Sequence, residues 1–569
     1  MRQICKHKYD ILAAAAFLMA ACFLWWRCKW GIGNADESFY LTVPYRLWMG
    51  DGLFQHEWHI SQMVGFLLLP FMKGYMLLSG GSTEGIVLSF RHIYVVVQTL
   101  AAVWMYLRLR RLDWLGALAA SLVFLLFAPS GIMALSYISL GILCLNLAFV
   151  LALTNEKGRR TDWAVAGLLF AAAVLCCPYL AAVYLLYCLA VLIKRFRKLP
   201  VGEGDVFSPK CWAWATAGAA ALAAVFLAFV FSRTSLKNIL TALPWIMLDP
   251  RHEPRSLLTI LTTYFTEMLE INRLLPLWLL AYAALLIAAR LGRSGRPRAA
   301  LCYLLGLLIG ACSLVALLVG DDFVNYLMFP LNLLAPFCCL LSKQQNTRRL
   351  LTCWWLPGML YTLLIHFGSN QGFFSIANAS AVPLGASLMI CVLTGRELLT
   401  AGVGPALRRA GAAMLAAVLL LQLSSLAWKR YSYVFWEPSL KAQTCYVEFG
   451  PQKGLMVSEE RYQHYEMLLN DTAPVRRENT GSVLYITTFS WLYLASPGME
   501  MGTYSGWLSA VGVYVADKLA AYYEMNPEKL PEAAYVEPLY GEIGQALFER
   551  YDYSAEETPL GSMIYIRNK

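Results

Sequence analysis

Residues 11–26 read ILAAAAFLMAACFLWW, and residues 34–40, NADESFY, follow after a short linking segment. The first stretch is apolar over almost the length that crosses a hydrocarbon core, about 20 residues at 1.5 Å each. Basic residues precede it, but no small-residue cleavage site lies before Trp25 and Trp26, so an uncleaved helix is expected instead of a signal peptide. The first membrane helix therefore ends just before a pair of acids, Asp36 and Glu37.

Apolar windows recur as far as residue 427 and then stop. Of the 569 residues, 59% are hydrophobic and only 14% are charged, against roughly 25% charged in soluble domains. Residues 1–427 are therefore predicted to form an all-α, polytopic membrane domain with about thirteen transmembrane helices. These windows are residues 11–30, 86–107, 113–128, 135–153, 162–177, 179–193, 211–231, 271–290, 300–319, 323–341, 350–367, 374–394 and 410–427.

The last part of the chain, residues 428–569, has a different pattern. It alternates strand-like runs, such as residues 483–488, with helix-like runs, such as residues 459–470. The sequence predicts a small α/β domain here.

Charge predicts how the chain is oriented. Residues 1–427 hold 34 Lys and Arg against 18 Asp and Glu, whereas residues 428–569 hold 12 against 18. If successive helices cross the membrane in opposite directions, 24 of those 34 basic residues lie on the same side as the N-terminus. The positive-inside rule makes this side cytoplasmic. An odd number of crossings then puts the C-terminal domain outside the cell membrane. Because basic loops account for the positive charge, nucleic acid is excluded as a partner.

Two predicted outer loops, residues 31–85 and 232–270, are too long to be simple turns, and long ordered loops are often functional. The first begins with Asp36 and Glu37. Paired acids at a membrane surface are costly to desolvate unless a metal, a donor or a substrate meets them. A structural explanation is equally open, with Asp36 as the N-cap of a helix that reaches the break at Val43 and Pro44.

The order of these features resembles the GT-C superfamily of glycosyltransferases, in the branch of the protein O-mannosyltransferases and aminoarabinose transferases. The resemblance covers nearly the whole chain and is carried by four features. These are Asp36, Glu37 and Tyr40 directly after the first helix, a turn at residues 50–52 (Gly-Asp-Gly), Arg91 inside the second helix, and about thirteen helices followed by an outer domain.

The resemblance implies transfer of a sugar from a polyprenyl-phosphate carrier to a cell-wall glycan, a glycolipid or a protein. It implies an inverting displacement in which Asp36 is the general base, while Glu37 orients the acceptor or binds a neighbouring group. Cations must neutralise the departing phosphate. Arg91 is the first candidate, with a structural ion pair to an acid of the loop as its alternative, and Arg46, Arg251 and Arg255 follow; an outer-face arginine also binds the headgroups of membrane lipids.

A divalent metal ion is the one cofactor that the resemblance implies, with Glu57, His56 and His252 as its candidate ligands. The chain departs from the family in two places. Glu57 is followed by Trp58 where the aminoarabinose branch has Lys-Pro-Pro, and residues 134–139 lack the additional Asp that many relatives carry. The alternative is that Glu57 and the two histidines are interfacial polar residues beside a Trp anchor.

Two further functions remain open: a transporter or flippase for a lipid-linked sugar, and a catalytically silent relative that binds glycans or lipids. A transporter is expected to place charges in several helices around a midplane site. Here the apolar windows are nearly free of charge apart from Arg91, and the carboxylates gather in the outer loops. This distribution favours chemistry at the outer face.

Overall fold

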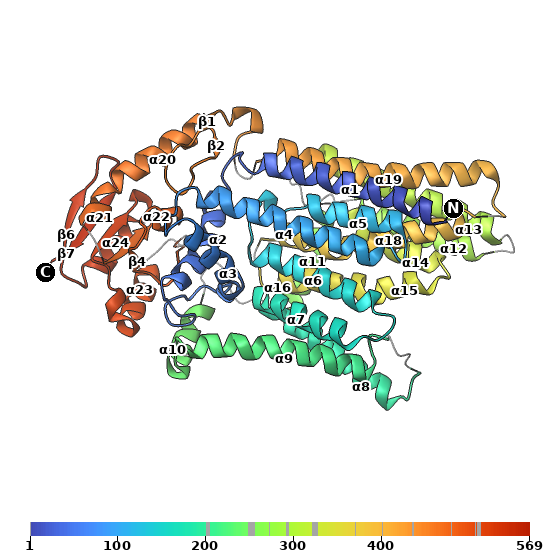
Figure 1. Cartoon of the computed structure of the whole chain (residues 1–569), viewed down its shortest axis with the longest axis horizontal. Coiled ribbons are helices and arrows are strands. Elements are labelled where there is room, and N and C mark those ends of the chain that lie inside the picture. Colours follow the sequence, from blue (N-terminus) through green and yellow to red (C-terminus); the bar gives the residue numbers. More distant parts are fainter. Residues whose placement is uncertain are drawn as a thin grey trace.

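A computed structural model describes residues 2–200, 205–248, 256–271, 274–291, 295–320, 328–369, 371–400, 402–434, 437–478, 481–506, 508 and 514–568. The molecule is elongated, with a helical bundle at one end and an α/β domain at the other (Figure 1). The N-terminus lies at the end of the bundle farthest from that domain. We refer to this end of the bundle as the basic end, because the loops rich in Lys and Arg lie there.

Each of the thirteen predicted apolar windows overlaps a helix. The helices concerned are α1 (Arg2–Arg27), α4 (Ile86–Leu109), α5 (Trp114–Leu126), α6 (Tyr137–Thr154), α7 (Arg160–Cys176), α8 (Ala181–Phe196), α9 (Pro209–Phe231), α12 (Leu275–Arg290), α13 (Gly295–Gly320), α14 (Phe329–Leu341), α16 (Leu356–Phe367), α18 (Ala381–Leu398) and α19 (Pro405–Ser432). Within the described part of the chain, nine spans are long and apolar enough to cross a membrane, and five other apolar helices are shorter. The chain therefore has the features of a polytopic membrane protein.

Small residues set how closely the helices approach. A Cβ added at Gly167 of α7 would lie 1.8 Å from the carbonyl oxygen of Ala215, and one added at Gly218 of α9 would lie 1.8 Å from that of Ala164. Each helix thus presents a glycine to an alanine of the other, and the two backbones touch. Close approach over small residues is how helices associate in lipid, where the hydrophobic effect does not drive them together.

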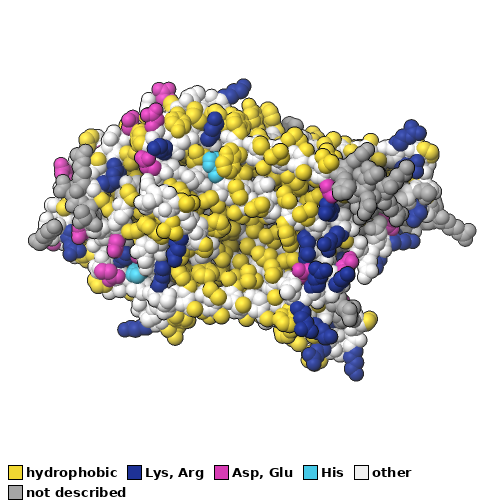
Figure 2. Space-filling view, viewed as in Figure 1, with side chains coloured by type: hydrophobic (Ala, Val, Ile, Leu, Met, Phe, Trp, Pro, Cys, Tyr) yellow, Lys and Arg dark blue, Asp and Glu magenta, His cyan; other side chains and the backbone are white. Residues whose placement is uncertain are grey.

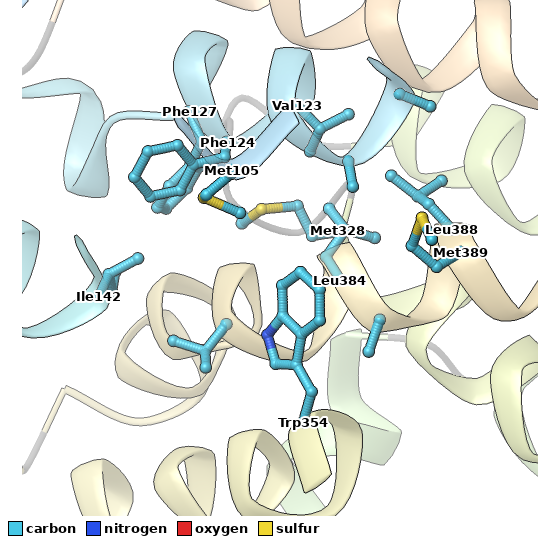
Figure 3. Packing of buried hydrophobic residues seen from close by; sticks show 14 of the residues in the cluster. Met105, Val123, Phe124, Phe127, Ile142, Met328, Trp354, Leu384, Leu388 and Met389 are labelled. Atoms are coloured by element: carbon cyan, nitrogen blue, oxygen red, sulfur yellow. The ribbon is translucent and has the colours of Figure 1, made fainter. Parts of the chain in front are cut away.

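The centre of the bundle packs around Trp354, which is fully buried and points into a cluster that includes Met105, Phe124, Met328 and Leu384 (Figure 3). The indole N–H is the only polar group of this side chain, and it donates to the side-chain oxygen of Asn146 on α6 at 3.1 Å. A buried indole therefore keeps its hydrogen bond inside an otherwise apolar core.

The two long loops are largely helical. Residues 31–85 contain α2 (Asn34–Trp48) and α3 (Val64–Leu78), and the second loop contains α10 (Leu236–Met247) and α11 (Leu257–Ile271). The expectation that Asp36 caps a helix is wrong, because Gly33 occupies the N-cap position and Asp36 lies inside the first turn. The helix also continues through Pro44 to Trp48 instead of ending at the proline.

The C-terminal α/β domain begins after α19, which runs five residues beyond the predicted boundary. Its five-stranded sheet has the order β4-β3-β5-β7-β6, with β3 parallel to β4 and β5, and β7 antiparallel to β5 and β6. The strands are β3 (Ser482–Ile486), β4 (Glu500–Met501), β5 (Ala533–Val536), β6 (Tyr553–Glu557) and β7 (Met563–Arg567), and β1 (Cys445–Tyr446) pairs with β2 (Met456–Val457). The helices are α20 (Glu459–Asp471), α21 (Ala473–Glu478), α22 (Trp491–Leu494), α23 (Tyr514–Met525) and α24 (Gly541–Phe548).

This domain is bonded to the first long loop and to the end of α1. The Met456 amide donates to the Lys29 carbonyl at 2.6 Å, and the Met456 carbonyl accepts from Gly31 at 2.7 Å. Farther along, the Trp58 amide donates to the Tyr504 carbonyl at 2.8 Å. The predicted strand and helix near residues 483 and 459 are confirmed as β3 and α20, and α2 lies between the bundle and the domain (Figure 1).

Candidate functional site

Asp36 and Glu37 are neighbours on α2, but they face different surroundings. The Glu37 side chain is buried, with its Oε1 accepting from Arg91 Nε at 2.5 Å and its Oε2 from Arg91 Nη2 at 2.6 Å. Oε2 also accepts from the Gly33 amide at 2.7 Å, which satisfies an orphan N–H at the start of α2. Glu37 is therefore a structural carboxylate that fixes the first turn of α2.

Arg91 completes this arrangement from α4. Its remaining terminal nitrogen, Nη1, donates to the carbonyl oxygen of Cys28 at 2.5 Å, just beyond the end of α1. All three guanidinium nitrogens are thus used to hold α1, α2 and α4 together. Of the two roles considered for Arg91, this geometry is that of an ion pair with an acid of the first loop.

Arg46, another candidate for the donor phosphate, lies in a second buried network. Its guanidinium donates to Asp51 at 2.9 Å, to Glu57 at 2.7 Å and to the carbonyl of Thr503 at 2.9 Å. Burial alone would lower the pKa of Arg46, but the charges of Asp51 and Glu57 outweigh it, so the pKa is raised. Lys529 adds a second cation, 2.8 Å from Asp51. This network joins α2 and the loop to the C-terminal domain, and its arginine has no open side for a phosphate.

Of the three proposed metal ligands, the structure describes His56 and Glu57, and both are hydrogen-bonded within the protein. His56 Nδ1 accepts from the Gly52 amide at 2.9 Å, and its Nε2 lies 3.5 Å from Glu528. The two oxygens of Glu57 are occupied by Arg46 and by the amide of His59, the latter at 3.0 Å. Among the described residues, no group of three His, Cys, Asp or Glu side chains could hold a metal ion. We derive no step through a metal.

The surroundings of the Asp36 carboxyl differ from those of its neighbour. Burial raises the pKa of Asp36 to about 6, and no cation of the described residues contributes to that shift. Within the described part of the chain, no hydrogen bond or ion pair to this carboxyl is present, although the residue is still partly accessible. A carboxylate that is desolvated and unpaired at neutral pH is poised to take a proton from another group.

Two tyrosines accompany Asp36. Burial, then the neighbouring Tyr137, then the charge of Asp36 raise the pKa of Tyr40. Their rings meet edge to face with centroids 5.8 Å apart. Tyr40 comes from α2 and Tyr137 is the first residue of α6, so the bundle and the first loop both contribute to the site.

Tyr137 was not among the residues that the sequence predicted. The segment that contains it was recognised only as a place where relatives carry an acid. Locally, Ser136 caps α6, and Ser136 and Ser139 bond each other's backbone in a capping box. This cap fixes where α6 begins and therefore holds Tyr137 opposite Tyr40.

Two buried arginines, Arg27 and Arg430, were also missed. Arg27 donates to the carbonyls of Arg430 and Tyr433, at 2.9 Å and 2.8 Å. Arg430 in turn donates to the carbonyl of Gly131 at 3.0 Å, in the connection between α5 and α6. In the sequence, both arginines lie at the ends of apolar windows and resemble ordinary flanking charges. In the structure, their hydrogen bonds fix the segment that leads to Tyr137. Arg251, Arg255 and His252, the remaining candidates, lie outside the described residues.

Comparison with known proteins found no family model that matches the chain and no curated protein with a matching sequence. The function is therefore argued from the geometry around Asp36.

We predict that Glu37→Gln destabilises the protein by about 3–5 kcal/mol, because it leaves the Arg91 guanidinium buried without its counter-charge. Thermal unfolding of the purified protein in detergent measures the loss. The double variant Glu37→Gln, Arg91→Gln serves as the control, and it should recover part of the lost stability because no lone charge remains. A Glu37→Gln protein as stable as the wild type would contradict the structural role of the pair.

Proposed function

We propose that the chain is a membrane glycosyltransferase that moves a sugar from a polyprenyl-phosphate carrier to an acceptor at the outer face of the membrane, with Asp36 as the general base. The observation that carries this proposal is the contrast between the two acids. Glu37 is neutralised by Arg91, whereas Asp36 is desolvated, unpaired among the described residues and has a pKa near 6. Neighbouring carboxyls in unlike environments are typical of sites where one does chemistry.

The reaction follows from these properties. An acceptor hydroxyl or amine attacks the anomeric carbon of the sugar, and its proton passes to the Asp36 carboxylate as the new bond forms. The bond between the anomeric carbon and the phosphate oxygen breaks, and its electron pair leaves on the polyprenyl phosphate. A general base works best when its pKa lies near the operating pH, and a value of about 6 satisfies this condition better than an ordinary aspartate would.

Tyr40 and Tyr137 give the site a surface for the substrate. Aromatic side chains offer apolar faces with a polar tip, and the Tyr40 and Tyr137 rings meet edge to face beside Asp36. We propose that the sugar or the acceptor packs against this pair while the Asp36 carboxylate meets the nucleophile.

The orientation follows from charge. We propose that the thirteen helices that match the predicted apolar windows all cross the membrane, with the N-terminus in the cytoplasm and the C-terminal domain outside. The Asp36 site and the C-terminal domain lie toward the same end of the molecule, away from the basic end (Figure 1). A lipid-linked donor can then reach the site laterally from the bilayer.

The phosphate of the donor needs cations near the site. Because Arg46 and Arg91 are engaged in buried ion pairs, Arg251 and Arg255 of the second loop are the remaining candidates for binding it.

We predict that Asp36→Asn lowers sugar transfer by about 10²- to 10⁴-fold, the usual cost of removing a general base. The amide keeps the shape of the side chain but cannot accept a proton at neutral pH. Purified wild-type and variant proteins would be incubated with a panel of polyprenyl-phosphate sugars, and release of polyprenyl phosphate measured. Full turnover by the variant would refute the role of Asp36. No turnover by the wild type on any donor would favour a transporter or a silent relative.

The pH dependence gives an independent prediction. Because the base must be ionised, the rate of sugar transfer should rise with pH, reach half its plateau near pH 6 and then level off.

The contribution of Asp36 to the free energy of unfolding should instead fall as pH rises. The folded-state pKa of Asp36 lies above the unfolded value, so folding disfavours ionised Asp36, and this cost grows from about pH 4 to pH 6. Asp36→Asn removes the cost, and its unfolding temperature at pH 7 should equal or exceed that of the wild type. A clear fall in that temperature, or a transfer rate flat between pH 5 and pH 8, would contradict an unpaired buried carboxylate.

A further inference from the structure

A cavity of about 270 Å³ lies between helices α6, α7, α8, α9 and α16, in the half of the bundle toward the basic end. Its walls are almost entirely apolar. They include Phe149, Trp163, Phe170, Phe207 and Leu360. Its volume is close to the lower limit for sites that bind small molecules, about 300 Å³.

The cavity exists because small side chains face it from helices that are held apart. Ala148 and Ala152 of α6, Ala190 of α8, and Ala215 and Ala219 of α9 all line it. The contact between Gly167 and Ala215 keeps α7 and α9 together, while α8 diverges from the bundle (Figure 1). The large side chains at the cavity, such as Phe149 and Trp163, form its walls and leave the space between these helices open.

Two tyrosine hydroxyls of the cavity lining are already hydrogen-bonded within the protein. The Tyr187 hydroxyl donates to the carbonyl of Val206 at 2.6 Å, and the Tyr184 hydroxyl bonds that of Thr216 at 2.6 Å. These two hydroxyls are therefore engaged within the protein, and the remaining lining is almost entirely apolar apart from the indole N–H of Trp163, which has no hydrogen-bond partner among the described residues. Such a surface suits a hydrocarbon chain.

Beyond Ala190, the last residue of α8 that lines the cavity, the chain toward the basic end is strongly cationic. The last turn of α8 and the residues after it carry Arg195, Arg197 and Lys198, all exposed, and no ion pair joins them to a carboxylate among the described residues. Nearby, Lys194 lies 3.1 Å from Asp205 and stacks on the ring of Phe207, which lines the cavity. Lys and Arg side chains gather over this part of the surface, around the ends of α8 and α9 (Figure 2).

We propose that this cavity binds one acyl chain of an anionic phospholipid from the leaflet at the basic end, with the phosphate of its headgroup held by Arg195, Arg197 and Lys198. The apolar walls select a hydrocarbon chain, and the cationic residues select an anionic headgroup over a zwitterionic one. Basic pockets between transmembrane helices bind anionic lipid headgroups in the same way.

This site is separate from the proposed active site and does not depend on it. Tyr137, beside Asp36, is the first residue of α6, whereas Ala148 and Ala152 line the cavity about 16–22 Å farther along that helix at 1.5 Å per residue. The bound chain would fill the gap beside α8 and stabilise the folded protein by mass action.

The full-length protein, purified in detergent, would be titrated with dioleoylphosphatidylglycerol or dioleoylphosphatidylcholine, and bound lipid counted by native mass spectrometry alongside the unfolding temperature. We expect one phosphatidylglycerol to be retained with at least about tenfold preference over phosphatidylcholine, and to raise the unfolding temperature. The triple variant R195Q, R197Q, K198Q should lose this preference. Equal binding of the two lipids by the wild type would overturn the proposal.

The cavity itself is tested by filling it. Ala190→Trp places an indole in the cavity and should abolish retention of the lipid, whereas Ala224→Trp, at an exposed position of α9, is the matched control and should retain it. In the wild type, phosphatidylglycerol with a photoactivatable acyl chain should crosslink to peptides of α8 and α9, which keeps the test valid if Ala190→Trp fails to fold. Crosslinks confined to other helices, or displacement of the lipid by an equal amount of undecaprenyl phosphate, would overturn the assignment.

Discussion

The paired hydrogen bonds between Glu37 and Arg91 are the interaction on which the rest of the site depends. They are buried, and they join α2 to α4 while the same guanidinium holds the end of α1. A charge this far from water is tolerated only with its partner in place. Once Glu37 is held, the helical spacing of about 100° per residue turns Asp36 to a different direction, where no described group neutralises it. One acid therefore fixes the backbone, while the other has no partner among the described residues.

The second network gives the same helix its outer support. Arg46, at the far end of α2, is enclosed by Asp51, Glu57 and the Thr503 carbonyl, and Lys529 neutralises the remaining oxygen of Asp51. Because Thr503 and Lys529 belong to the C-terminal domain, α2 is tied to the bundle at one end and to that domain at the other. The domain therefore contributes to the rigidity of the site, and preorganised carboxylates are what general-base chemistry requires.

Much of the fold could be predicted, because apolar windows and the distribution of charge are read directly from the sequence. The periods of strands and helices in residues 428–569 likewise indicated the small α/β domain. The partners of the charged residues could not be predicted. Arg91 meets an acid 54 positions away, and Arg46 meets Thr503 457 positions away. Nothing in the loop sequence distinguishes such structural arginines from phosphate ligands. The cap expected of Asp36 failed because Gly33 takes that position and Glu37, not Asp36, accepts the free amide. The contact of Tyr137 with Tyr40 depends on how α6 and α2 lie in space, which the sequence does not indicate.

The role of Asp36 as the base of a sugar transfer can be seen in a structure of the protein with a non-hydrolysable polyprenyl-phosphonate sugar and a bound acceptor. We expect an acceptor oxygen or nitrogen within about 3 Å of the Asp36 carboxylate and within about 3.5 Å of the anomeric carbon. The sugar should lie beside Tyr40 and Tyr137. A sugar bound with its anomeric carbon far from Asp36, or an Asp36 carboxylate paired with a cation in the complex, would contradict it.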